Sequence, residues 1–382
     1  MSELAAEWNA LHARIEDAHP STTHAWISAW KEYLEQGARP LRSTLWLYVI
    51  RAEDDSLVAV IPAVRHEISL LGVTLTRWLD IGVVSPYVEP TPMLVAPEHE
   101  REVIGVLARE IDSSAYEAVF WMGLRHAAMA DVLARDGACE ETGCFRLVVP
   151  LPDSWSAMES KLSRNMRKTL KHDYGAVTAL GRGLEFKVWE TPQDVGPALD
   201  ALFALNLRRP EGFRLNPQYR QFVTPRASAF LRALIGRLAP VGMVRIFQLS
   251  VGGQIVAMRI GIVYRGGIYL YFFADDAAWK KFGVLTTTTA EIFKYSIAQR
   301  YRFVYLSTAR TRSNVRWRPE ETPIGRVAIW SRTPRARLLS AARTSRRELI
   351  FLFRDAASNA RAMSKRWRSR ASDGTRSDSH PS

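Results

Sequence analysis

The sequence predicts an α/β (α+β) protein with two similar domains, each a mixed, mostly antiparallel sheet flanked by helices. Three observations predict this class. Residues 244–306 contain three apolar runs separated by glycine turns, then a helical stretch and a fourth apolar run. A shorter hairpin pattern of the same kind occupies residues 45–64. The chain has 382 residues, enough for two domains of about 100–200 residues each.

The three strands of the later domain are the clearest elements. Strands are predicted at Val244–Ser250, Gln254–Val263 and Ile268–Ala274. Gly252-Gly253 and Gly266-Gly267 separate them, and paired turn glycines between β-branched or aromatic runs indicate hairpins. The three runs therefore predict an antiparallel meander.

A helix and one more strand follow this meander. The segment that starts at Trp279 predicts a helix to about Gln299, and Phe303–Leu306 predicts the next strand. Backbone N–H groups at the start of a helix are a suitable binding site for a pyrophosphate. This order of elements therefore predicts a phosphate-binding loop at the start of the helix.

The earlier domain repeats part of this order. Helices are predicted at Leu4–Ala18 and Ala25–Gln36, with Thr22 or Thr23 as the cap of the second. Asp54-Asp55 takes the place that Gly252-Gly253 holds in the later hairpin. A proline-marked loop, a helix and a strand complete the predicted domain: residues 85–92, Glu98–Glu110 and Ala118–Met122.

The chain is expected to divide into three parts. The first domain spans residues 1–150, the second 151–334, and a basic tail 335–382. The tail is predicted to form a helix around residues 347–353 and then to be disordered. The second domain is predicted to begin with a basic helix and a strand, followed by two more helical stretches: Trp155–Tyr174, Leu184–Trp189, Gln193–Arg208 and Asn216–Leu238.

These motifs resemble the GNAT acyltransferase core, in the form found in the CelD-type group of cellulose and exopolysaccharide biosynthesis. Fem-type peptidyltransferases, which carry two GNAT units in tandem, are similar in shape. The resemblance covers about residues 4–330 and is carried by Lys161–Lys168, Gly253–Ala257 and Lys280–Leu285 ahead of a helix. It implies tandem GNAT-like domains. The first is expected to lack a donor site, because its loop has only prolines where the second has glycine. We therefore assign the donor site to the second domain.

Composition limits the other classes of function. Cys139 and Cys144 form neither a disulfide framework nor a zinc pattern, and the histidines do not cluster, so no metal is expected. The first residues lack a signal-peptide pattern and no apolar run reaches the roughly 20 residues of a membrane span. A cytoplasmic protein is expected, with possible attachment to the inner face of the membrane.

The net charge of +13 is concentrated in the tail. Residues 332–382 hold twelve Arg and one Lys against four acidic residues, so they contribute +9 and the rest of the chain only +4. A small charge on the body makes a large nucleic-acid footprint unlikely. The tail is a candidate contact for a membrane surface or a synthase complex.

Acyl-CoA, with acetyl-CoA as the first choice, is the expected co-substrate. Backbone N–H groups near Gly283 would bind its pyrophosphate, and the two lysines beside it would add positive charge. In the GNAT pattern a small residue ends this loop, and Leu285 stands there instead. The predicted cofactor-binding residues are Val256, Ala257, Lys280, Lys281, Phe282, Gly283, Val284 and Leu285.

Two residues of the third strand are the catalytic candidates. Tyr271 could protonate the leaving thiolate, and Asp275, at the strand end, could take a proton from the acceptor. Core packing is the alternative interpretation for the aromatic side chain, whereas the position of Asp275 at the strand end favours a functional role. The family resemblance places such groups where GNAT sites open.

Basic residues outside the loop are candidates for acceptor binding. The helix at 155–174 places its arginines on one face, where they would bind a phosphorylated acceptor or simply remain solvated. A stretch after the last strand departs from the family pattern but offers a basic and an aromatic residue. The predicted substrate-binding residues are Arg164, Asn165, Arg167, Arg208, Arg316 and Trp317.

The sequence thus predicts an acyltransferase acting on a cell-envelope or exopolysaccharide (cellulose-type) precursor by direct attack on a thioester. Two alternatives stay open. A Fem-like transferase would take its acyl group from aminoacyl-tRNA, and salt-sensitive donor binding would favour it. A GNAT scaffold without activity would dock to a synthase or a membrane through the basic tail.

Overall fold

The computed structural model describes most of the chain before the tail. The described residues are 1–35, 41–70, 73–80, 88–89, 93–113, 116, 118–124, 138–140, 144–208, 224–338 and 340–341. They divide into a first unit, Met1–Ile329, and a second unit that begins at Trp330. The predicted tail helix around 347–353 and the expected helix at 216–223 lie outside the described residues. The predicted boundary near residue 150 stays a prediction.

The first part of the chain follows the predicted order of helices and hairpin. Thr23 caps the second helix, because its side chain accepts a hydrogen bond from the backbone N–H of Trp26. The elements are α1 (Ala5–Arg14), η1 (Pro20–Thr22), α2 (His24–Leu34), β1 (Leu41–Arg51), β2 (Leu57–Leu70), β3 (Val73–Asp80), β4 (Leu94–Val95), η2 (Pro97–His99), α4 (Glu100–Ser113), β5 (Ala118–Leu124), β6 (Ala138–Glu140) and β7 (Cys144–Pro150).

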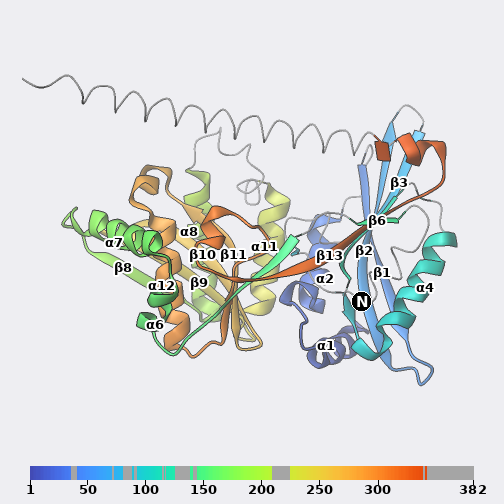
Figure 1. Ribbon diagram of the computed structural model, residues 1–382, viewed down its shortest axis with the longest axis horizontal. Helices are drawn as coiled ribbons and strands as arrows, with labels where there is room; N and C mark the ends of the chain where they lie inside the picture. The colour runs from blue at the N-terminus through green and yellow to red at the C-terminus, as the bar shows by residue number, and fades with distance from the viewer. Residues whose placement is uncertain are drawn as a thin grey trace, which may run out of the picture. The chain divides into compact units, whose positions relative to one another are not determined.

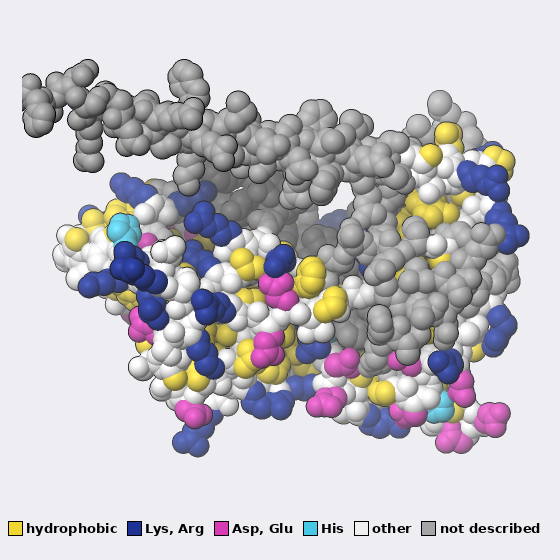
Figure 2. Space-filling model, in the orientation of Figure 1, with side chains coloured by type: hydrophobic (Ala, Val, Ile, Leu, Met, Phe, Trp, Pro, Cys, Tyr) yellow, Lys and Arg dark blue, Asp and Glu magenta, His cyan; other side chains and the backbone are white. Residues whose placement is uncertain are grey.

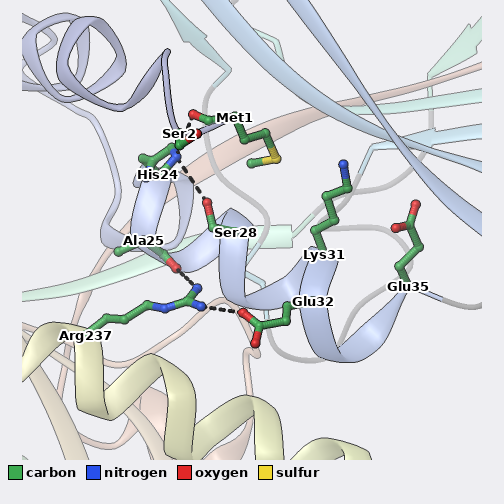
Figure 3. A pocket seen from close by; sticks show the side chains of 9 residues that line it. All are labelled: Met1, Ser2, His24, Ala25, Ser28, Lys31, Glu32, Glu35 and Arg237. Atoms are coloured by element: carbon green, nitrogen blue, oxygen red, sulfur yellow. Dashed lines mark hydrogen bonds and ion pairs between the residues drawn. The ribbon is translucent and has the colours of Figure 1, made fainter.

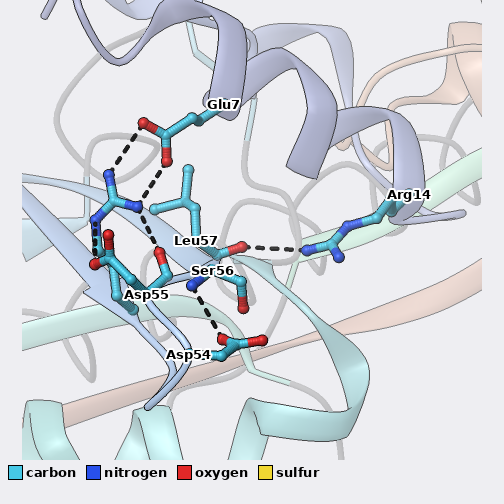
Figure 4. A network of polar contacts seen from close by, with 7 residues as sticks. Glu7, Arg14, Asp54, Asp55, Ser56 and Leu57 are labelled. Carbon is cyan, nitrogen blue, oxygen red and sulfur yellow. Dashed lines mark hydrogen bonds and ion pairs between the residues drawn. The ribbon is translucent and has the colours of Figure 1, made fainter.

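Polar contacts hold the β1–β2 turn against α1 (Figure 4). Arg51 donates hydrogen bonds to both carboxylate oxygens of Glu7 and to the carbonyl of Asp55. Asp54 accepts from the backbone N–H of Ser56 inside the turn. The turn where the later hairpin has two glycines is therefore stabilised here by acidic side chains.

The second part contains the meander, the helix and the strand that the sequence predicts. The elements are α6 (Trp155–Lys161), α7 (Arg164–Thr178), β8 (Leu184–Trp189), α8 (Pro192–Leu207), α11 (Pro225–Leu238), β9 (Val244–Val251), β10 (Gln254–Tyr264), β11 (Gly267–Asp275), η3 (Ala277–Phe282), α12 (Val284–Ala298), β12 (Phe303–Tyr305), α13 (Arg312–Val315) and β13 (Glu320–Trp330).

The prediction of one helix over 155–174 is wrong, because the chain breaks between α6 and α7. Ser163 is the N-cap of α7, and its side chain accepts from the N–H of Met166. Arg167 donates to the carbonyls of Ser160 and Leu162, which lie at the end of α6. Ser163 stabilises the start of α7, and Arg167 stabilises the end of α6. The charge pattern alone predicted one continuous helix.

One continuous sheet joins strands from both parts of the chain. Its order is β1-β2-β3-β5-β13-β7-β12-β11-β10-β9-β8. β7 pairs with β12 through Val148–Pro150, and Cys144–Val148 pairs with Glu320–Ile324 of β13. Farther along, β13 pairs with β6 through Val327–Ile329. Figure 1 shows β13 running between the two groups of strands. The last strand of each part therefore pairs with strands of the other part.

Apolar packing and His12 attach α1 and α2 to the later strands. One hydrophobic cluster includes Trp8 and Trp26 together with residues of α11, β9, β10 and β11. Nδ1 of His12 lies 2.6 Å from the hydroxyl of Tyr264, and burial lowers the pKa of His12 to about 4. The neutral imidazole therefore connects α1 to β10 at ordinary pH.

The start of β11 leaves no room for a side chain at Gly267. A Cβ there would overlap the Phe303 ring of β12. We expect Gly267→Ala to lower the free energy of unfolding by about 1–3 kcal/mol, because overpacking forces the ring or the strands apart. Urea denaturation of the full chain measures the change.

Two variants test this cause. Gly236→Ala in α11 meets nothing within 4 Å and should be neutral or stabilising by about 0.4–1 kcal/mol. In a Phe303→Leu background the cost of Gly267→Ala should shrink. Equal costs in both backgrounds would show that the ring is not responsible.

Candidate functional site

β11 and β12 separate at their carboxyl ends. They pair in parallel only through Gly267–Tyr269 and Phe303–Tyr305, whereas β11 continues to Asp275. The β10–β11 register shifts so that both Tyr271 and Phe272 lie opposite Ile260. This extra residue is a β-bulge, which bends the strand that carries it. The bulge and the short pairing together open the sheet edge.

A small cavity of about 90 Å³ lies beside this opening. Its walls come from the first two turns of α12, from the strands on either side of the bulge, and from α13 with the residues after it. It brings together three predicted site residues, Leu285, Arg316 and Trp317. The lining residues are Arg259, Phe273, Leu285, Thr286, Thr289, Leu306, Ser313, Asn314, Arg316 and Trp317.

The predicted phosphate-binding loop forms the junction of η3 and α12. Gly283 has φ +66°, a left-handed conformation that favours glycine, and Val284 begins α12. Lys280 and Lys281 are exposed, and Phe282 packs at 5.3 Å from the ring of Trp279. The structure therefore provides a helix start with two lysines beside it, as the sequence predicts.

A carboxylate lies against this helix start. A Cβ on Gly283 would overlap the carboxylate of Asp173, which is buried on the inner face of α7. The charge of Asp173 also acts on Arg316, where it opposes the effect of burial, which lowers the pKa of Arg316. The missing side chain at Gly283 thus makes room for Asp173, a partner that the sequence pattern did not indicate.

Val256 and Ala257 occupy the middle of the sheet. β10 pairs with β9 on one side and with β11 on the other, so it is not an edge strand at which a donor amide could pair. The carbonyl of Val256 accepts from the N–H of Asp276 at 2.9 Å. On the side of β11 that faces β12, the pairing of these two strands ends at Tyr269. Donor contact at Val256 and Ala257 stays a prediction.

Tyr271 and Asp275, the catalytic candidates, do not line the cavity. The Tyr271 hydroxyl lies 3.3 Å from each ring nitrogen of His19, and its ring packs on Trp26. Burial raises the pKa of Tyr271 well above its ordinary value, so the phenol keeps its proton. Asp275 is buried opposite Ala257. Tyr271 therefore faces η1 and α2, while Phe273 faces the cavity.

The predicted acceptor-binding residues of α7 are exposed. Figure 2 shows Lys and Arg side chains gathered over this end of the molecule. Arg164 and Asn165 belong to the first turn of α7, Arg167 caps α6, and Arg208 is exposed at the end of α8. The buried face of α7 instead carries Met166, Leu170, Asp173 and Val177. These four predicted side chains lie outside the cavity that Arg316 and Trp317 line.

Two residues near the opening escaped the sequence analysis. Arg259 interrupts a buried apolar strand, and a charge at such a position is costly without a partner, which is a signal that could have found it. Glu89 belongs to the proline-marked loop and accepts from Ser307 Oγ at 2.6 Å and Thr308 Oγ1 at 3.0 Å. Its partners are more than 200 residues away, so no local pattern points to it.

The residues that Glu89 contacts, Ser307 and Thr308, lie just after β12. Ser307 has φ +76°, a left-handed conformation that is strained for a residue with a side chain. Burial raises the pKa of the Glu89 carboxyl, while the hydroxyl donors oppose the rise. The carboxyl group therefore takes up a proton more readily than an exposed glutamate.

A larger cavity of about 580 Å³ lies between α2 and α11 (Figure 3). Arg237 donates to the carbonyl of Ala25 and pairs with Glu32, and His24 contacts the carbonyl of Met1. Its charged lining groups are balanced between Lys31, Arg237 and two glutamates. The cavity contains no predicted site residue, so we assign the site to the opening at β11 and β12.

The family of the later domain follows from this geometry and from sequence. Residues 164–312 match the family described as an acetyltransferase (GNAT) domain. This stretch contains the bulged strand, the separated strand ends and the helix start described above. The matched stretch therefore carries a GNAT acetyltransferase domain, and the predicted enzyme class, an acyltransferase, is confirmed.

Solved structures resemble the chain over most of its length. FemX has a TM-score of 0.58 at 11% identity, covering 87% of this chain and 98% of its own. The C-terminal domain of an Agrobacterium fabrum protein assigned as a lysylphosphatidylglycerol synthetase scores 0.53 at 12% identity, covering 89% and 95%. A Bacteroides thetaiotaomicron VPI-5482 protein of unknown function scores 0.54 at 11%, covering 86% and 97%.

At such identities these likenesses show the fold alone, and they confirm the predicted fold class of tandem GNAT-like domains. No curated protein matches the chain in sequence. The described residues include no group of His, Cys, Asp and Glu that could hold a metal ion. Among the helices that the structure describes, none is long and apolar enough to cross a membrane.

The raised pKa of Glu89 predicts a pH dependence of stability. The folded state holds the proton more tightly than the unfolded state, so stability is fully present below about pH 4.3. It should be lost as pH rises through the folded pKa. Glu89→Gln should remove this dependence, which urea denaturation from pH 4 to 8 measures as the difference between wild type and variant.

Glu98→Gln at an exposed position of η2 is the matched control and should leave the pH dependence of the wild type. A difference between wild type and Glu89→Gln that stays constant with pH would contradict the buried, protonated carboxyl.

Proposed function

We propose that this acyltransferase moves an acyl group from acyl-CoA, with acetyl-CoA as the first candidate, to an amine or hydroxyl of a cell-envelope or exopolysaccharide precursor. The observation that carries the donor is the cavity at the separated ends of β11 and β12, under the first turns of α12. The helix start suits a pyrophosphate, and the opening suits the thioester end. The acceptor follows from the resemblance to the CelD-type group.

The proposed reaction is a direct transfer. The acceptor nitrogen or oxygen attacks the thioester carbonyl carbon, a base takes its proton, the C–S bond breaks, and the thiolate leaves and is protonated. The assignment of the base to Asp275 and of the acid to Tyr271 stays a proposal from the sequence: burial keeps the Tyr271 phenol protonated, but both side chains lie outside the lining of the cavity, so the donor would have to reach them beyond it. Positioning and proton transfer would supply the rate enhancement.

One observation favours aminoacyl-tRNA as the alternative donor. The Asp173 carboxylate lies against the start of α12 and would repel a pyrophosphate there. α7, which carries Asp173 on its buried face, has exposed cations on its outer face, and these would suit a phosphate backbone. FemX shares the fold, and the name of the Agrobacterium relative refers to a lysyl lipid, so both fit a transferase that uses activated amino acids.

Calorimetric titration with acetyl-CoA tests the proposed donor. The wild type should bind with a dissociation constant of about 1 μM to 1 mM, the usual range for substrates. Thr286→Glu places a carboxylate in the first turn of α12 beside the cavity and should weaken binding about tenfold or more. Gln299→Glu, exposed at the far end of α12, should leave the affinity within about twofold.

If the folded wild type does not bind acetyl-CoA, the proposal that acyl-CoA is the donor is wrong. Salt-sensitive binding of aminoacyl-tRNA by that protein would support the alternative. Unchanged acetyl-CoA binding by Thr286→Glu would place the donor elsewhere.

Asp173→Asn gives the opposite change at the same helix start. Removing the carboxylate should strengthen acetyl-CoA binding by about two- to fivefold, because the helix dipole and Arg316 then face the donor without a competing anion. The same titration measures it. Weaker binding would instead show that Asp173 positions the loop for the donor.

A further inference from the structure

Arg259 is a charged residue in the buried part of β10. Its neighbours Met258 and Ile260 are fully buried. The guanidinium lies 5.9 Å from the centre of the Phe273 ring, and Nη1 donates to Thr289 Oγ1 at 3.3 Å. Its Nε is buried without a hydrogen-bond partner. Within the part of the chain that the structure describes, Arg259 forms no ion pair.

Burial lowers the pKa of Arg259 to about 10, so the side chain remains charged at neutral pH. A half-buried guanidinium with a buried, unpaired Nε and no ion pair among the described residues destabilises the protein, and one weak hydrogen bond does not offset that cost. The residues on either side, 255–258 and 260–263, are apolar, so an apolar residue at this position would make the strand more stable. Arg259 is therefore expected to meet its counter-charge in a bound molecule.

The cavity beside Arg259 is suited to an anion. Arg316 forms part of the same lining, and its Nε lies 2.8 Å from Met166 Sδ. Asp173 offsets part of the Arg316 charge and Arg312 adds to it. The polar residues of the lining are Thr286, Thr289, Ser313 and Asn314, and none of its described members is acidic. Arg259 is left as the cation without compensation.

The size of the cavity limits the ligand. A cavity of about 90 Å³ admits a small polar group rather than a whole nucleotide. A carboxylate with its carbon is a group of this size. The flat fork of an arginine also matches the two oxygens of a carboxylate.

We propose that this cavity binds a carboxylate carried by the reacting end of a substrate, with Arg259 as its ion partner. The assignment to a substrate rests on the proposed acyl transfer. Two sources share this chemistry: a donor whose acyl group is a dicarboxylic acid linked through one carboxyl, or an acceptor with a carboxylate near the attacking atom. In either case Arg259 selects the substrate by charge.

Titrations of the full chain with acetyl-CoA, succinyl-CoA and free malonate test the proposal. For the wild type we expect malonate to bind, and Arg259→Met to abolish that binding. If the donor carries the carboxylate, succinyl-CoA should bind about tenfold or more tightly than acetyl-CoA, and the variant should lose this preference. If the acceptor carries it, malonate should bind while the two thioesters bind alike.

Several controls keep the outcome clear. Arg182→Met removes an exposed arginine before β8 and should match the wild type. Arg259→Lys keeps the charge without the fork and should give intermediate affinity for malonate; it replaces Arg259→Met if that variant does not fold. Thermal unfolding of each variant checks that it folds.

The results also separate this proposal from the donor proposal. Binding of malonate without binding of either thioester would reject acyl-CoA and keep the carboxylate site. The proposal is overturned if the wild type does not bind malonate and also binds succinyl-CoA no more tightly than acetyl-CoA. It is also overturned if Arg259→Met binds malonate as the wild type does.

Discussion

The pairing of β7 between β12 and β13 is the constraint on which the rest of the structure depends. It makes one sheet from strands that lie far apart in the chain, so neither part can complete its sheet alone. The buried contacts of His12 with Tyr264 and of His19 with Tyr271 form only when α1 and η1 are held over β10 and β11. The surroundings of Tyr271 therefore depend on both parts of the chain.

The candidate site lies in the same sheet, at the point where β11 and β12 stop pairing. The bulge at Tyr271 and Phe272 bends β11, and β12 stops at Tyr305 while β11 continues. The opening lies beside the start of α12, where we propose that the thioester binds. The GNAT class is thus visible in a local irregularity of the sheet, and the family match covers the residues that produce it.

The opening places a carboxylate at the helix start, which a simple phosphate-binding loop would not have. Asp173 approaches the start of α12 from α7, and Arg316 balances part of it. Arg259 forms no ion pair with a described residue, and its Nε is buried without a hydrogen-bond partner. An anion near the reacting end would neutralise Arg259, whereas an anion at Gly283 must compete with Asp173. The two positions therefore make different demands on the substrate.

Local sequence determined the elements, because glycine turns, apolar runs and capping residues such as Thr23 act within a few positions. It predicted β8 to β12 and the helix start at Gly283, and it named Leu285, Arg316 and Trp317 as site residues with separate roles. It could not predict the exchange of β7 and β13, since strand pairing across more than 100 residues leaves no periodic signal. It likewise missed the contacts of Asp173 with Gly283 and of Glu89 with Ser307. Only the tertiary structure decides which buried charges meet, because each carboxylate reaches its partner through the packing of distant elements.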